Sequence, residues 1–190
     1  MEVIEAMKTR RSIRRYKAIP VDDKTVELVL EAARWAPSWA NRQCWRFIVV
    51  RDTNIKNQLV NSLVKVESGD TLVDNPSLKA VASAPVVIVA CAELRKAGFE
   101  LGKPATDKGD YWYMYDVALA MQNLALAAHS LGLGTVTIGA MDAKKTGNIL
   151  GVPEGFCVVS MVPLGYPDQE PKPRPRKELS EIVFHDKFGS

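Results

Sequence analysis

Two short stretches near opposite ends of the chain concentrate its arginines, and their composition suits a phosphate group. The first, RRSIRRY, places three guanidinium groups and a hydroxyl within five residues, from Arg10 through Arg11 and Ser12 to Arg14. Guanidinium forks make bidentate, charge-assisted hydrogen bonds to phosphate oxygens, and a serine hydroxyl adds a short neutral one. A solvated basic helix end is the alternative, because cations favour the C-terminal end of a helix dipole. The local sequence leaves both interpretations open.

The second stretch, KPRPRK, carries Arg174 and Arg176 close to the C-terminal end. Such a composition is typical of a flexible charged tail. Its prolines nevertheless restrict the backbone and hold the two arginines at a fixed reach. A second clamp on the same kind of anion is therefore a credible interpretation.

A polar loop with the sequence PSWANRQC leads into a predicted strand, WRFIVVRD. Trp39 lies inside the loop and Trp45 opens the strand that comes next. Indole rings offer a stacking surface, and amides and hydroxyls can bind the polar edge of a flat heteroaromatic ring. We expect Trp39 to contact a ligand and Trp45 to pack in the core. The neutral hydrogen-bonding side chains of the loop are Ser38, Asn41 and Gln43.

Other catalytic signatures are missing from the sequence. It contains no GxGxxG, GxxxxGKS or GxSxG motif, its carboxylates are scattered, and its cysteines show no CxxC spacing. His129 lies in an apolar segment, where a packed or capped histidine is more common than a ligand, and His185 lies near the terminus. We therefore predict no catalytic side chain and no metal site. The absence of these signatures favours a reaction whose chemistry is supplied by a bound cofactor.

Alternating helical and strand patterns must position these residues. The spacing of Val3, Ile4 and Met7 predicts a helix that ends near the first arginine stretch. Asp22 or Asp23 offers an N-cap for a second helix that Pro37 stops. Further helices are predicted around Ile55 and after Asp142. Strands are predicted at residues 45–52, 84–91 and 156–165, with the segment 133–140 between the last two.

The segment from Gly109 to Gly132 is apolar on nearly every side of a helix. Only Asp116, Gln122, Asn123 and His129 interrupt it. A sheet in a domain of this size covers one side of such a helix, so a second subunit is the expected cover for the rest. The sequence alone therefore predicts a homodimer.

The length of 190 residues suggests one domain spanning residues 1–190, with 167–190 as an extended C-terminal segment. No apolar run is long enough to cross a bilayer, so no membrane partner is expected. The net charge of +3 is too small to indicate a nucleic-acid partner. The first residues do not form a secretion signal, and a cytoplasmic location is the default expectation.

Taken in order, RRSIRRY, APSWANRQCW, MQNLALAAHSLGLG with TVTIGAMD, and GYPDQEPKPRPRKEL resemble the FMN-dependent nitroreductase family over essentially the whole chain. The resemblance implies an α/β (α+β) three-layer sandwich with a mixed, mainly antiparallel sheet and a C-terminal segment exchanged in the dimer. It also implies two FMN sites at the dimer interface and an enzyme that passes hydride from NADH or NADPH through flavin N5 to a small acceptor. Nitroaromatics, quinones and flavins are the acceptors expected, in a ping-pong sequence.

The same resemblance assigns roles to residues. It implies that Arg10, Arg11 and Ser12 hold the FMN phosphate and ribityl chain, that Arg14 approaches the pyrimidine edge, and that a basic pair closes over the phosphate. That pair is Arg174 and Arg176. The residues expected to border the ring with their backbone are Thr137, Ile138 and Gly139, with the Gly139 N–H directed at N5. The residues expected from the opposite subunit are Pro37, Ser38, Trp39 and Asn41.

Two departures from the family pattern affect the expected acceptor pocket. Cys44 replaces a proline that is common in this loop, and the large Trp39 stands where a smaller residue is usual. An FMN-binding storage or sensor protein with little turnover is an alternative from a different functional class. A module that binds an anionic partner through the two basic stretches is a third, and it predicts a colourless protein with steeply salt-dependent binding.

Overall fold

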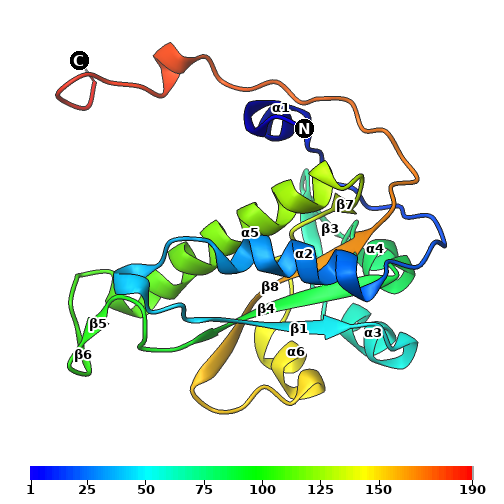
Figure 1. Cartoon of the computed structure of the whole chain (residues 1–190), viewed down its shortest axis with the longest axis horizontal. Coiled ribbons are helices and arrows are strands. Elements are labelled where there is room, and N and C mark those ends of the chain that lie inside the picture. Colours follow the sequence, from blue (N-terminus) through cyan, green and yellow to red (C-terminus); the bar gives the residue numbers. More distant parts are fainter. Residues whose placement is uncertain (190) are drawn as a thin grey trace.

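A four-stranded sheet lies between two layers of helices in the computed structural model, which describes residues 1–189 (Figure 1). The strand order is β1-β4-β8-β7, and each neighbouring pair is antiparallel. The strands are β1 (Trp45–Val50), β4 (Val86–Glu93), β8 (Phe156–Gly165) and β7 (Gly134–Thr135). A bridge between Ser12 and Thr135 adds one parallel pairing at the β7 edge. The predicted three-layer fold with a mainly antiparallel sheet is confirmed.

Strand β4 is buried on both faces, as its continuous apolar sequence predicts. Because side chains alternate along a strand, Ile88 and Ala90 enter one core and Val87 and Val89 enter the other. Each helical layer covers one of these cores.

One layer consists of α2 (Asp23–Arg34) and α5 (Trp112–Ser130), which pack against each other over the sheet, and α1 (Val3–Thr9) contacts α5. Asp22 caps α2 by accepting the Thr25 N–H at 2.9 Å, as the sequence predicts. A 3-10 turn, η2 (Gly109–Tyr111), precedes α5. Helix α5 therefore begins three residues later than its apolar segment.

The other layer consists of α3 (Thr53–Val60), α4 (Leu78–Ser83) and α6 (Ala143–Leu150). Asp52 and Asp142 cap α3 and α6 in the same way as Asp22 caps α2. The predicted helix starts at Asp22 and Asp142 are thus confirmed.

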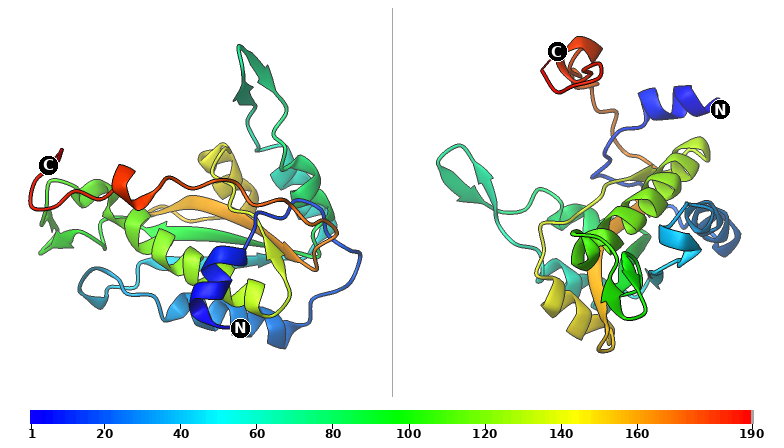
Figure 2. Two further views of the ribbon diagram at one scale, coloured as in Figure 1. Left: turned by 90° about the horizontal axis from the view of Figure 1, so that it is seen from above. Right: turned by 90° about the vertical axis from the view of Figure 1, so that its left-hand side faces the viewer.

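Two small hairpins and α4 are absent from the sequence-based prediction. The hairpin β2 (Val66–Ser68) and β3 (Thr71–Val73) projects away from the body (Figure 2). The hairpin β5 (Phe99–Glu100) and β6 (Lys103–Pro104) precedes α5. Their strands of two or three residues are too short to produce a readable alternation of apolar and polar positions. A further 3-10 turn, η1 (Trp39–Asn41), lies in the loop before β1.

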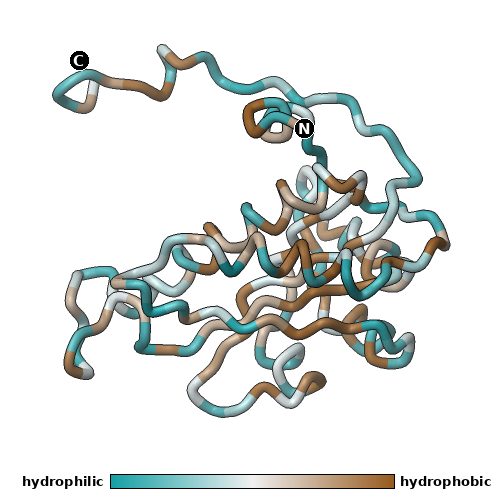
Figure 3. Tube along the Cα trace, viewed as in Figure 1, coloured by the Kyte–Doolittle hydropathy of each residue, from teal (hydrophilic) through white to brown (hydrophobic). Residues whose placement is uncertain are grey.

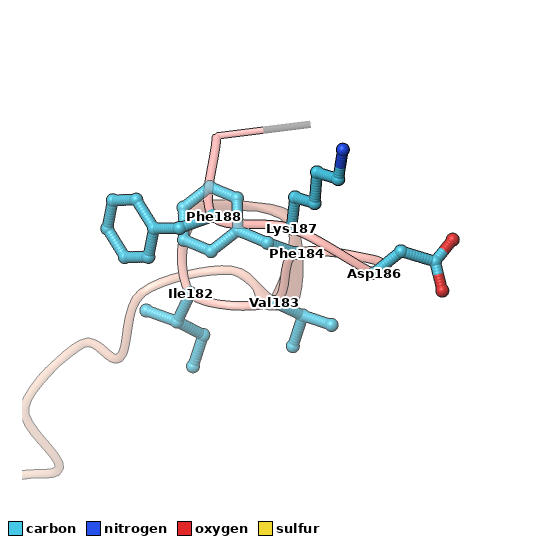
Figure 4. A pocket seen from close by; sticks show the side chains of 6 residues that line it. All are labelled: Ile182, Val183, Phe184, Asp186, Lys187 and Phe188. Atoms are coloured by element: carbon cyan, nitrogen blue, oxygen red, sulfur yellow. The ribbon is translucent and has the colours of Figure 1, made fainter.

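The chain after β8 leaves the body in extended form, as its proline-rich composition predicts (Figures 1 and 2). Its only regular element among the described residues is η3 (Leu179–Glu181). Apolar positions recur at its far end (Figure 3). There Phe184 and Phe188 pack with ring centroids 4.5 Å apart in a turn that also carries Ile182 and Val183 (Figure 4). Residue 190 of the predicted 167–190 segment lies outside the described residues.

None of the helices within residues 1–189 combines the length and the apolarity that crossing a bilayer requires.

Candidate functional site

The first arginine stretch runs as an extended segment between β7 and the beginning of the C-terminal tail. Ile13 N–H donates to the carbonyl of Thr135 at 2.9 Å. Lys17 N–H donates to Tyr166 O at 2.9 Å, and Asp168 N–H donates to Arg15 O at 3.0 Å. Backbone pairing therefore joins three parts of the chain that are far apart in sequence.

Two glycines make this close packing possible. A Cβ on Gly134 would lie 2.6 Å from Ile13 Cγ1 and 2.7 Å from Ile13 Cβ. A Cβ on Gly165 would lie 3.1 Å from Tyr16 Cδ1, and Tyr16 OH donates to Ile13 O at 2.6 Å. A Cβ at Gly134 would force the arginine segment and β7 to move apart.

A hollow of about 400 Å³ opens beside this segment. Arg10 and Arg11 reach it from the end of α1, and His129 reaches it from the C-terminal end of α5. Tail residues close its other side. The full lining is Thr9, Arg10, Arg11, Ile13, His129, Leu133, Gly134, Thr135, Pro167, Gln169, Glu170, Pro171 and Pro173.

The charges around the hollow are predominantly positive. Burial and the nearby cations Arg11 and Arg176 lower the pKa of Arg10. Arg11 Nη1 donates to the carbonyl oxygens of Lys8, at 2.7 Å, and Arg10, at 2.9 Å. No ion pair within residues 1–189 involves Arg10, Arg11 or Arg176. The two arginine stretches therefore converge on one region, where Glu170 also lines the hollow but forms no ion pair with them within the described residues.

His129 belongs to the same cluster, although the sequence assigned it no role. Its Nε2 lies 2.8 Å from Thr9 Oγ1. Burial, followed by the positive charges of Arg10 and Arg11, lowers the pKa of His129. An anion in the hollow would oppose that effect.

Arg14 presents an unused donor. Its Nε is buried and has no hydrogen-bond partner within the described residues. A buried guanidinium N–H without an acceptor is costly, and a ligand acceptor would remove that cost. Ser12, half-buried beside it, pairs with Thr135. The side chains present thus fit a ligand that carries an anionic group and further hydrogen-bond acceptors.

The turn at residues 137–139 exposes its backbone on one side. Ile138 is buried and exchanges both backbone hydrogen bonds with Met161, at 2.9 and 3.0 Å. Thr137 and Gly139 on either side of it are exposed. A Cβ on Gly139 would meet nothing within 4 Å, so this turn borders open space.

The polar loop before β1 lies elsewhere. Its hollow of about 240 Å³ is lined by Pro37, Ser38, Trp39, Trp112, Tyr115, Asp116 and Leu119. Asp116 and His129 are 13 positions apart on α5, which corresponds to about 20 Å along a helix. A single chain therefore does not bring Pro37, Ser38, Trp39 or Asn41 to the arginine cluster, and Figure 1 shows the two regions at opposite ends of α5.

Trp39 is half-buried rather than free in the loop. Its ring stands edge-on to Trp112 with centroids 4.8 Å apart, and its Nε1 is buried without a partner. Trp45 is buried in the core, as predicted. The remaining predicted residues of the loop, Ser38 and Asn41, hydrogen-bond within it: Ser38 Oγ accepts the Gln43 N–H at 3.0 Å.

Asp116 and Cys44 form a buried polar contact that sequence reasoning missed. Cys44 Sγ lies 3.8 Å from Asp116 Oδ2. Burial raises the pKa of Asp116, and burial together with the Asp116 charge raises the pKa of Cys44 to about 12. The one signal in the sequence was a carboxylate interrupting an otherwise apolar helix.

Comparison with known proteins gives consistent results. Residues 7–166 match the Nitroreductase family. An NADH dehydrogenase from Thermus thermophilus is 31% identical over 199 residues, covering 92% of this chain and 91% of the relative. Among solved structures, a nitroreductase family protein from Clostridium novyi NT is 31% identical with a TM-score of 0.75. The match covers 100% of this chain and 96% of that chain. The NADPH:FMN oxidoreductase from Vibrio harveyi, solved in complex with NAD+, is 27% identical with a TM-score of 0.81, covering 99% of this chain and 78% of that chain.

Proposed function

The chain belongs to the Nitroreductase family, and on that premise we propose that it is an FMN-dependent oxidoreductase working between NADH or NADPH and a small organic acceptor. The Vibrio harveyi neighbour is named for FMN and NADPH, which supports this choice of cofactor and donor. The observation that carries the proposal is the convergence of Arg10, Arg11 and Arg176 without an acidic partner.

The phosphate of FMN is the proposed occupant of the arginine hollow. Arg10, Arg11, Arg176 and Ser12 supply forked and single donors, and Arg174 lies next to Pro173 on the hollow wall. A phosphate dianion is the group that such a cluster of unneutralised cations favours. Arg14, whose Nε lacks a partner, is the proposed contact to the pyrimidine edge of the ring.

The isoalloxazine ring is proposed to lie against the turn of Thr137, Ile138 and Gly139. The absence of a side chain at Gly139 leaves the backbone free to approach a flat ring. Arg14 places a positive charge at the ring edge, where it favours an anionic form of the cofactor.

A second copy of this chain is proposed to complete each site. Val3, Ile4 and Met7 are more than half exposed on α1, and the end of the tail exposes Leu179 and Phe188. Apolar surface of this extent is typical of an interface. A homodimer in which the tails are exchanged would cover these residues. It would also bring Pro37, Ser38, Trp39 and Asn41 of one subunit to the FMN of the other.

When bound, FMN would supply the redox chemistry that links the nicotinamide donor to the acceptor. The side chains of this chain bind the phosphate, orient the ring and leave one face open. Donor and acceptor would use that face in turn, which corresponds to a ping-pong sequence. Nitroaromatics, quinones and flavins are the proposed acceptors, with Trp39 restricting the size of the pocket.

The experiment is an absorbance spectrum of the purified protein followed by rapid mixing with NADH or NADPH. The proposal expects a flavin band, FMN release on denaturation, and loss of the band on mixing with at least one donor. A colourless protein that binds no added FMN contradicts the cofactor assignment. Bound FMN that neither donor reduces contradicts the enzyme and favours a storage or sensor protein.

A further inference from the structure

Helix α5 buries a carboxylate that the proposed reaction does not use. The Asp116 side chain is 1% exposed, and no cation pairs with it in any ion pair within residues 1–189. An ionised carboxylate loses much of its hydration on burial, and burial without a cation is especially unfavourable. An apolar residue would pack α5 against the core at lower cost. A carboxylate in this position needs an explanation beyond packing.

Apart from the side chain of Trp112, one turn earlier on α5, the contacts of Asp116 lie at the two ends of one loop. Its Oδ1 and Oδ2 accept the backbone N–H of Trp39 at 3.2 and 3.1 Å. The thiol of Cys44, which is 0% exposed, donates to Oδ2 at 3.8 Å. One side chain from α5 therefore fixes both the entrance and the exit of the loop between α2 and β1.

The backbone between these two contacts is strained. Ala40, Asn41 and Gln43 have φ values of 42°, 55° and 49°, in the left-handed region that residues other than glycine rarely adopt. Such conformations persist only when the surrounding structure over-determines them, and they are concentrated at functional sites. Inside the loop, the Ser38–Gln43 and Asn41–Gln43 contacts add support. Two backbone hydrogen bonds add more: Asn41 N–H donates to Ser38 O at 3.0 Å and Arg42 N–H donates to Trp39 O at 2.7 Å.

We propose that Asp116 is a positioning residue for the acceptor site: by binding Trp39 and Cys44 together, it holds the strained loop in the shape that presents Trp39 and Asn41 to the flavin of the neighbouring subunit. This inference rests on the proposed function for its consequence in catalysis. The clamp itself is a property of one chain and can be measured without cofactor.

The first test measures the clamp in FMN-free protein. In a background with Cys91→Ser and Cys157→Ser, Cys44 is the only thiol. Its rate of alkylation by iodoacetamide, followed as a function of pH to separate a change in the thiol pKa when the Asp116 charge is removed, reports how often the loop opens. Asp116→Leu, which fills the space but accepts no hydrogen bond, is expected to raise the rate about 10-fold or more. Asp116→Asn retains one acceptor and should give an intermediate rate. Equal rates in all three proteins overturn the proposal.

Asn123→Ala is the matched control. Asn123 is another polar residue of α5, but its Nδ2 donates to Ala32 O of α2 at 3.2 Å and not to the loop. We expect this variant to leave the alkylation rate of Cys44 within about twofold of the parent. An equal acceleration in Asn123→Ala and Asp116→Leu would show general loosening of α5 and would also overturn the proposal.

The second test uses FMN-loaded protein with a natural cysteine background. With saturating donor and 1,4-benzoquinone as acceptor, Asp116→Leu is expected to lower kcat/KM for the quinone about 10- to 100-fold, with partial recovery in Asp116→Asn. Retention of FMN should change little, because the proposed phosphate contacts lie about 20 Å from Asp116, at the other end of α5. If FMN-loaded Asp116→Leu shows normal quinone kinetics, the catalytic consequence of the proposal is wrong. If the wild-type protein does not bind FMN, the proposed function is wrong, but the alkylation result still tests the clamp.

Discussion

Replacing Gly134 by alanine tests whether sheet packing positions the arginine segment. The new Cβ would lie 2.6 Å from Ile13 Cγ1, whereas carbon atoms pack favourably at about 3.5–4.0 Å. The segment must therefore move by about 1 Å, and overpacking of this kind costs about 1–3 kcal/mol. Loss of the hydrogen bond from Ile13 N–H to Thr135 O adds about 1 kcal/mol. We expect Gly134→Ala to lower the free energy of unfolding by about 2–4 kcal/mol.

The same displacement should weaken FMN binding, because Arg14 directly follows Ile13 and Arg10 lies three residues before it. Loss of one charge-assisted contact is worth about 1.5–3 kcal/mol, which corresponds to about 10- to 100-fold in Kd. Urea denaturation measures the stability change, and fluorescence titration of apoprotein with FMN measures the affinity.

Gly147→Ala is the control for Gly134→Ala. Gly147 lies inside α6, and a Cβ there would meet Val152 Cβ at 3.7 Å and Val158 Cγ2 at 3.8 Å, which are ordinary contacts. Because alanine is a better helix former, this variant should gain up to about 1 kcal/mol and keep its FMN affinity. Wild-type stability and FMN affinity in Gly134→Ala would refute the argument that the sheet edge positions the arginines.

Three further predictions concern titration and assembly. Because burial raises the pKa of Asp116, the folded protein holds the carboxyl proton more tightly than the unfolded chain does, and wild type loses stability as pH rises above the ordinary value of 3.8. The free energy of unfolding of Asp116→Asn relative to wild type should therefore increase between pH 4 and pH 7 in urea titrations. The neighbouring Cys44 thiol, with its pKa raised to about 12, stays neutral throughout this range, and an unchanged difference would contradict the burial argument. Phosphate binding should raise the lowered pKa of His129. The ratio of FMN affinities between wild type and His129→Gln should therefore grow as pH falls from 8 to 6, by up to about tenfold for each unit by which the pKa rises. A constant ratio would show that the phosphate binds elsewhere. Deleting residues 178–190 should shift the protein from dimer to monomer in analytical ultracentrifugation, and an unchanged dimer would show that the tail is dispensable for assembly.

Local sequence patterns predicted the helix starts and the buried strand, because these depend on residues that are close together in the sequence. Asp22 and Asp142 begin helices because an aspartate before an apolar repeat accepts a free backbone N–H. The continuous apolar run that contains Val87 to Ala90 is buried on both faces, as its lack of alternation predicts. The sequence also predicted that Arg10 and Arg176 act together, and the structure brings their charges within interaction range.

Long-range contacts were beyond such patterns. Nothing near Gly134 in the sequence indicates that Ile13 packs on its Cα, and nothing near His129 indicates Thr9 as its partner. Asp116 was visible as an interruption of an apolar helix, but its contacts with the loop depend on the packing of α5 against the segment before β1. The role predicted for the loop in binding flavin stays a prediction, because it concerns two chains.

We propose that arginines from both ends of the chain bind one phosphate. The most direct measurement compares the affinities of FMN and riboflavin, which lacks the phosphate, for wild type, Arg10→Ala, Arg176→Ala and the double variant. We expect wild type to prefer FMN by about 100-fold or more. Each single variant should lose at least about tenfold in FMN affinity with little change for riboflavin, and the two losses should not be additive. Equal affinity of the wild type for FMN and riboflavin would contradict it.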